Sequence, residues 1–168
     1  MMKQMEFTKK KIGENTFYIK PFPAFPAAYI SAELSRVLAP AVGELGPVLK
    51  GEVGEKFDIM DIDVEDALPA LSGALGSISG EKMESLMKLL LIRHKNISVK
   101  GPATDNEPAV LDEDLADEVF CGELQDMLIL CFEVVKVNYA GFFKKIAGRF
   151  GGPKGSTETG ETQESTEA

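Results

Sequence analysis

Residues 112–150 constrain the fold of this chain more than any other stretch. Residues 112–126 contain seven acids and no base, an unbroken apolar run follows from Met127 to Phe132, and the segment from Lys136 onward carries bases but no acid. Because valines follow the apolar run, little of this segment can face water, and its pattern predicts a helix packed among other elements. The separation of acidic from basic residues indicates a surface for protein partners rather than a cleft for a small substrate.

The composition limits the class of protein. With 168 residues, 44% of them hydrophobic, the chain can bury the core of one soluble domain. Its longest apolar run is far shorter than the ~18 residues of a membrane helix, so no membrane contact is expected. The first eleven residues lack the apolar region of a secretory signal, which predicts a cytoplasmic protein. The net charge of −9 repels phosphates, so nucleic acid is not an expected partner.

The sequence predicts neither a metal site nor a cofactor. The chain has two cysteines and one histidine, too few for a disulfide framework or a structural zinc site. Cys131 lies within the apolar run and is expected to be buried. The stretch DIDVED (61–66) begins like a calcium loop, but Asp66 and Ser72 replace the glycine and glutamate that such a loop requires.

The N-terminal half predicts a β-hairpin followed by helices. Residues 6–12 and 16–20 are prone to form strands and flank a turn that begins at Gly13. After three prolines that end the second strand, apolar spacing predicts a helix over about 26–39. The glycines between 40 and 61 favour a loop with a short helical turn, and a further helix is expected to begin at about 64 or 68.

The C-terminal half predicts a well-defined helix, a small second hairpin and a long helical region. Apolar residues at helical spacing from Met83 to His94, with Ser79 as N-cap and a Glu84–Lys88 pair, mark the helix. Residues 96–100 and 108–111 favour short strands. The final helical region, capped by Asp112, is expected to break near residue 122 and again near 139–141.

These elements together predict a mainly α fold. Residues 1–150 are expected to form a single helical domain with a short N-terminal β-hairpin and an optional second small hairpin. Residues 151–168 contain almost no apolar side chains, so they are expected to form a disordered acidic tail.

No motif in the sequence predicts an enzyme. His94 belongs to the residue type most used in acid–base catalysis, but it falls at the end of a helix, where the helix dipole favours a structural role. The stretch GSISG (76–80) lacks the central serine of a nucleophile elbow. Neither a phosphate-binding loop nor a dinucleotide fingerprint occurs in the sequence.

Two groups of residues are candidates for a partner-binding surface. The end of the last helical region carries aromatic residues beside bases, and the stretch before it carries acids. The alternative interpretation is that the phenylalanines close the core while the bases face water. The candidate residues are Phe142, Phe143, Phe150, Lys144, Lys145, Arg149, Asp114, Asp117 and Glu118.

Four stretches carry a resemblance to a known family. They read ENTFYIKPFPAFPAAYISAELSRVLAP (14–40), DVEDALPALSGAL (63–75), KLLLIRHKNISV (88–99) and DLADEVFCGELQDMLILCFEVVKVNYAGFF (114–143). Their hydrophobic and aromatic positions together resemble the tail assembly chaperones of long-tailed phages and prophages. The resemblance covers nearly all of residues 5–150 and does not include the tail.

The resemblance implies a non-enzymatic role in virion assembly. Such a protein would bind the tape measure protein, keep its long hydrophobic helices soluble and help to recruit tail tube subunits. It would act in the cytoplasm of the bacterial host and be lost from the finished particle, and many members also have a longer frameshifted form. Self-association is left open. The alternative is a structural connector or tail completion subunit, whose gene would not lie between the tail tube and tape measure genes.

Overall fold

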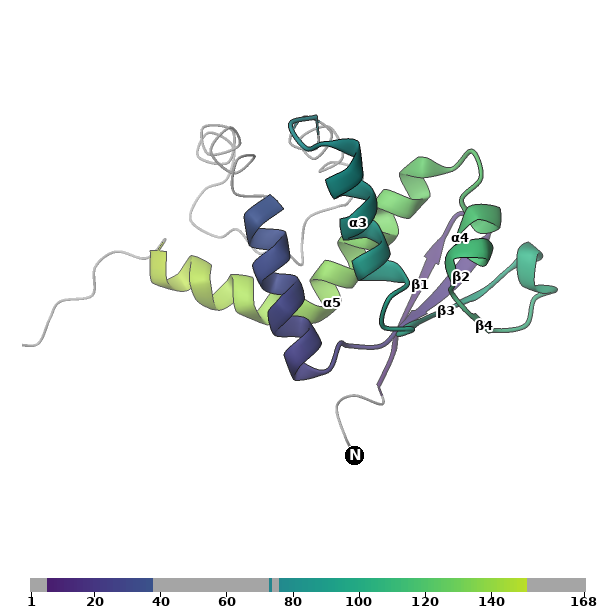
Figure 1. Ribbon diagram of the computed structural model, residues 1–168. Helices are drawn as coiled ribbons and strands as arrows, with labels where there is room; N and C mark the ends of the chain where they lie inside the picture. Colours follow the sequence, from purple (N-terminus) through teal and green to yellow (C-terminus); the bar gives the residue numbers. More distant parts are fainter. Residues whose placement is uncertain (1–5, 38–72, 74–75, 151–168) are drawn as a thin grey trace, which may run out of the picture.

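The computed structural model describes residues 6–37, 73 and 76–150 (Figure 1). Its strands are β1 (Thr8–Ile12), β2 (Asn15–Ile19), β3 (Ile97–Lys100) and β4 (Ala109–Val110). Its helices are one at residues 24–37, α3 (Gly80–Leu91), α4 (Glu113–Val119) and α5 (Leu124–Phe150), with a short 3-10 helix, η2 (Pro102–Thr104), between β3 and β4.

The four strands form one antiparallel sheet in the order β1-β2-β3-β4. Gly13 makes the tight β1–β2 turn with φ of +57°, a conformation that glycine adopts without strain. The central pairing joins β2 to β3, with Ile19 opposite Ile97. Asn96 extends this pairing, because its backbone carbonyl accepts from Lys20 N at 2.9 Å and its side-chain amide donates to the Lys20 carbonyl at 2.9 Å.

The prediction of a mainly α fold is wrong. Both predicted hairpins are present, but they join edge to edge through β2 and β3 into a single sheet, so the fold is α+β. The paired residues lie 78 to 84 positions apart in the sequence, from Ile19 with Ile97 to Thr16 with Lys100, and no local pattern predicts such a contact. The core accordingly forms between a sheet and helices rather than among helices alone.

One face of the sheet is buried beneath the helices. Five of the side chains that point to this face are almost fully buried: Ile12, Phe17, Ile19, Ile97 and Val99. Phe17 stacks on Phe120, which follows α4, with 5.7 Å between the ring centroids. Figure 1 shows α3, α4 and α5 gathered beside the strands. The opposite face carries polar and charged side chains, and this alternation along each strand is typical of a two-layer fold.

The long helix α5 supplies much of the core. Leu130 and Val134 are fully buried in it, as the apolar run predicts. The predicted break near residue 122 is confirmed, because Gly122 has φ of +78° between α4 and α5. The predicted break near 139–141 is wrong, since α5 continues without interruption to Phe150. Asp112 caps α4 as predicted, accepting from Leu115 N at 2.9 Å.

Two side chains of α5 hold the proline-rich link after β2 and the first turn of the helix at 24–37. Asn138 Oδ1 accepts from Phe22 N at 2.7 Å, and the Tyr139 hydroxyl donates to the Ala27 carbonyl at 2.6 Å. Burial raises the pKa of Tyr139 to about 12. These bonds fix the start of the helix at 24–37 against the middle of α5.

Helix α3 forms as its sequence predicts. Ser79 is the N-cap, and its side chain accepts from Lys82 N at 3.4 Å. Lys88 Nζ lies 2.8 Å from Glu84 on the same helix and 2.6 Å from Glu113 on α4. The carboxylates of Glu113 and Glu84 raise the pKa of Lys88, and the Glu113 pair ties α3 to α4.

Several predicted features lie outside the described residues. They are the loop at 40–61, most of the helix expected from 64 or 68, the DIDVED stretch and the tail at 151–168. Among the helices that are described, none is long and apolar enough to cross a membrane.

Candidate functional site

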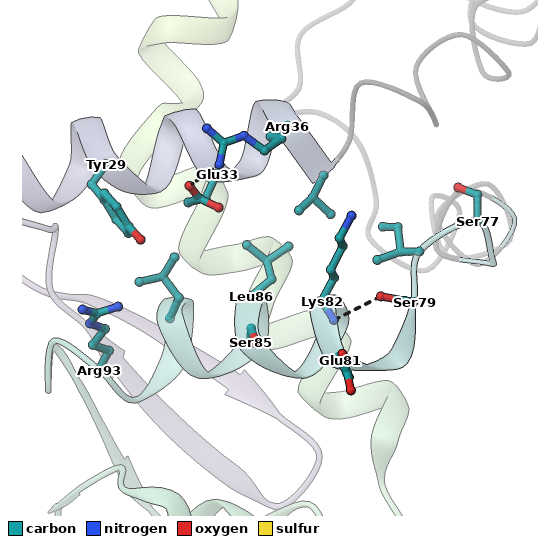
Figure 2. Close-up of a pocket in the computed structure, with 13 residues that line it drawn as sticks. Tyr29, Glu33, Arg36, Ser77, Ser79, Glu81, Lys82, Ser85, Leu86 and Arg93 are labelled. Carbon is teal, nitrogen blue, oxygen red and sulfur yellow. Dashed lines mark hydrogen bonds and ion pairs between the residues drawn. The ribbon is translucent and has the colours of Figure 1, made fainter.

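A groove of about 620 Å³ lies between the helix at 24–37 and α3, and it is called the helix groove below. One wall comes from the helix at 24–37 and the other from α3 and the turn before it (Figure 2). The lining residues are Tyr29, Glu33, Arg36, Val37, Ser77, Ile78, Ser79, Glu81, Lys82, Ser85, Leu86, Leu89 and Arg93.

The helix groove has apolar residues at its base. Leu86 and Leu89 belong to the hydrophobic core, with 8% and 7% of their surface exposed, and Val37 packs against that core. The sequence positions these residues because both helices turn one apolar stripe inward, toward each other and toward α5. An apolar side chain entering the groove would therefore contact the existing core.

The mouth of the helix groove is charged and aromatic. Tyr29 is 52% exposed, and the Arg93 guanidinium carbon lies 5.9 Å from the centre of its ring, within cation–π range. Arg36 Nη1 pairs with Glu33 Oε1 at 3.0 Å on the same rim. Figure 2 shows Tyr29 and Arg93 at one end, and Lys82 extending from α3 toward the opposite helix.

The residue types that line the groove bear on its chemistry. Among the described residues that form the groove there is no histidine or cysteine, and the Ser79 side chain is engaged in capping α3. The described part of the chain contains no cluster of histidine, cysteine and acidic residues that could hold a metal ion. His94 packs edge-on against Phe22, with ring centroids 5.5 Å apart, and does not line the groove.

The structure separates the two groups of predicted partner-binding residues. Asp114, Asp117 and Glu118 are exposed on α4, just before α5 begins. Phe142, Phe143, Phe150, Lys144, Lys145 and Arg149 belong to the last turns of α5, and their side chains lie outside the described part of the structure. At 1.5 Å per residue, the eighteen steps from Leu124 to Phe142 span roughly 27 Å of helix. The two groups thus lie toward opposite ends of α5, and their role in binding stays a prediction.

The helix groove was not anticipated from the sequence. Tyr29, Glu33 and Arg36 do share one side of a helix by their spacing, and an exposed tyrosine beside charges is a signal for binding. The second wall, however, begins some forty residues further along the chain. No pattern within either helix shows that the two face each other.

A comparison with models of known protein families shows which family the chain belongs to. A family model described as "Phage tail assembly chaperone protein, TAC" matches residues 13–151, which is most of the chain. The chain belongs to this family. Comparison with curated proteins and with solved structures gave no match.

Membership of the tail assembly chaperone family confirms the resemblance seen in the sequence and assigns the protein to phage tail assembly. The family is not a class of enzymes. Partners of such a chaperone are tail proteins in general.

Proposed function

We propose that this chaperone binds the tape measure protein, keeps it soluble until the tail assembles, and helps to recruit tail tube subunits to it. The observation that carries the proposal is the family match over residues 13–151. The proposed place of action is the cytoplasm of the bacterial host, with the chaperone leaving before the virion is complete.

The helix groove supports a specific way of holding such a client. The proposed client, a tape measure protein, would present long apolar helices. An amphipathic helix can lay its apolar face on a groove between two helices, with anchors every three or four residues. The base formed by Val37, Leu86 and Leu89 would receive the anchors, and Tyr29 with Arg93 would close over one end.

The charge of the chaperone supports the solubilising role. The net charge of −9 on 168 residues keeps a complex in solution even when the client's remaining surface is apolar. Phe142, Phe143 and Phe150 are proposed as a second contact region, since a client of many helical turns can extend beyond one groove.

The test is co-expression with the tape measure protein of the same phage or prophage. The tape measure protein should be recovered in the soluble fraction with the chaperone and in the pellet without it. Purified virions should lack the chaperone when examined by mass spectrometry. A tape measure protein that stays insoluble, or a chaperone present in virions in stoichiometric amount, would contradict the proposal and favour a structural subunit.

A groove-filling variant tests the helix groove itself. Ser85→Trp places a large side chain in the groove without removing a core contact, because Ser85 is exposed on α3. Ser35→Trp is the matched control, an exposed serine on the helix at 24–37 that does not line the groove. Only Ser85→Trp should reduce the soluble tape measure protein. Equal recovery with both variants would place the client elsewhere on the chaperone.

A further inference from the structure

The face of the sheet turned away from the helices, called the open sheet face below, carries a charge opposite to that of the chain. Strand alternation and register place two rows on it, one from Lys9 through Tyr18 and Ser98 to Val110, the other from Lys11 through Thr16 to Lys100. None of the four described strands contains an acidic residue, although acids outnumber bases 27 to 18 in the whole chain.

The open sheet face also exposes apolar and aromatic surface. Phe7, which is 53% exposed, packs edge-on against Tyr18 with 5.3 Å between ring centroids. Val110 is 49% exposed at the other end of its row. The basic residues Lys9, Lys11 and Lys100 are exposed around these side chains, and none of them forms an ion pair with another described residue.

Protection of a sheet edge explains only part of this surface. Lysines on an edge strand such as β1 hinder pairing with other chains, which accounts for Lys9 and Lys11. Lys100, however, lies on β3, an inner strand. The register puts Lys11 and Lys100 on either side of Thr16, two strand spacings or roughly 10 Å apart. A basic face across three strands is suited to an acidic protein surface.

The same chain displays such an acidic surface on α4. Asp114, Asp117 and Glu118 are exposed at i, i+3 and i+4, and among the described residues they form no ion pair. This spacing puts the three carboxylates within about 6 Å of their neighbours on one side of the helix. The acidic surface on α4 is therefore similar in length to the surface between Lys11 and Lys100.

The two surfaces cannot meet within one molecule. α4 packs on the buried face of the sheet through Ala116 and Phe120, so its carboxylates point away from the strands. We propose that the open sheet face of one copy binds the acidic side of α4 on a second copy, so that copies of the chaperone associate head to tail.

Three properties follow from this geometry. Because the two surfaces differ, each copy keeps one of each free after pairing, and association can continue into a row. Because exposed ion pairs are individually weak, association requires high protein concentration and falls with salt. If several copies bind along one long client, as proposed above, their high local concentration favours the contact, but the contact itself does not require a client.

Sedimentation of the full-length chaperone tests the proposal in the absence of any client. At a protein concentration of roughly 0.5 mM and about 50 mM salt, the weight-average mass should exceed the monomer mass of 18.2 kDa, and it should return to that value at about 500 mM salt. A monomer under both conditions would overturn the proposal. This result would leave tape measure binding unaffected, so the two proposals fail separately.

Charge reversal identifies the surfaces. Lys11→Glu/Lys100→Glu and Asp114→Lys/Asp117→Lys should each remain monomeric alone, associate when mixed with each other, and regain self-association when combined in one chain. Lys95→Glu, at an exposed base in the turn between α3 and β3 that lies outside both surfaces and outside the helix groove, is the control and should leave salt-sensitive association in place. If a reversed variant loses its melting transition, Lys11→Gln/Lys100→Gln and Asp114→Asn/Asp117→Asn replace it and should weaken association at least tenfold. Association that survives changes at both surfaces would overturn the proposal.

Discussion

Replacement of Lys10 by methionine tests how α5 is seated on the sheet. Glu133 on α5 is only 5% exposed, and its Oε1 lies 3.0 Å from Lys10 Nζ on β1. A second cation, Lys136, lies 3.7 Å from the same oxygen. The Lys10→Met variant keeps the apolar part of the side chain but leaves the buried carboxylate with the more distant lysine alone.

The expected loss of stability is about 2 kcal/mol. Two unit charges 3.0 Å apart attract by roughly 5–6 kcal/mol at an effective dielectric constant of about 20, and desolvation of the carboxylate offsets much of this. Removing one partner of a fully buried pair costs about 3–5 kcal/mol. The Lys10 side chain is 41% exposed and Lys136 remains nearby, so the loss should fall below that range.

Thermal and urea denaturation measure this loss. About 2 kcal/mol corresponds to a fall in Tm of roughly 4–8 °C for a chain of this size. Lys9→Met is the matched control, because Lys9 is exposed on the opposite face of the same strand, and it should change stability by less than about 0.5 kcal/mol. The double variant Lys10→Met/Glu133→Leu should recover most of the stability, since an apolar pair replaces a buried ionic one. Equal Tm values for Lys10→Met and Lys9→Met would refute the buried pairing of α5 with β1.

Further changes test the packing of α5 and the first turn. Tyr139→Phe removes the hydrogen bond to the Ala27 carbonyl and should cost about 1 kcal/mol at neutral pH. Because the folded pKa of Tyr139 is raised from 10.0 to about 12, its contribution is fully present below pH 10 and is lost as pH rises through 12, so denaturation curves of Tyr139→Phe should lack this alkaline loss. Cys121 is exposed, whereas Cys131 is half-buried on α5 and burial raises its pKa to about 12, so a maleimide should label Cys121 much faster than Cys131 in the native protein and both thiols rapidly in denaturant. Equally rapid labelling of both thiols in the native protein would contradict the packing of α5. Gly13→Ala should cost about 1–2 kcal/mol in urea denaturation, because residue 13 has positive φ and a Cβ there would lie 2.7 Å from Asp126 Oδ2; an unchanged midpoint would show that the turn differs.

Local elements of this fold can be predicted from the sequence, and the sheet cannot. Ser79 and the apolar stripe of α3 lie within one short window, and so do the residues of each hairpin turn. The pairing of Ile19 with Ile97 depends on hydrophobic faces from distant segments. A mainly α fold was expected because each hairpin alone contains few strand residues. The pairing of the two hairpins into one sheet depends on tertiary contacts.

Helix α5 is unbroken because its packing against other elements outweighs the low helix propensity of the residues near position 141. Gly141 costs a helix interior about 1 kcal/mol relative to alanine, which is why a break was expected near it. Asn138 and Tyr139, just before it, make hydrogen bonds to Phe22 and to Ala27 in the first turn of the helix at 24–37. These contacts require helical geometry at the very point where the sequence alone favours a break.

The sequence predicted the kind of site, a surface that binds protein, but not where that site lies. The absence of catalytic motifs and the sided charge pointed to protein binding, and family membership supports a role of this kind. The helix groove joins Tyr29 to Arg93 across more than sixty residues of sequence, so its location required the fold. The acidic residues of α4 were predicted from the sequence only as part of a partner-binding surface, a role that stays a prediction, and the structure shows that they are exposed. The basic surface that we propose as their complement forms only once both hairpins share one sheet.

The recovery of soluble tape measure protein on co-expression tests the central claim most directly. The account predicts that the wild-type chaperone and the Ser35→Trp control keep the tape measure protein in the soluble fraction and co-purify with it, whereas Ser85→Trp does so to a much smaller extent. A tape measure protein that is equally insoluble with and without the wild-type chaperone would contradict the claim.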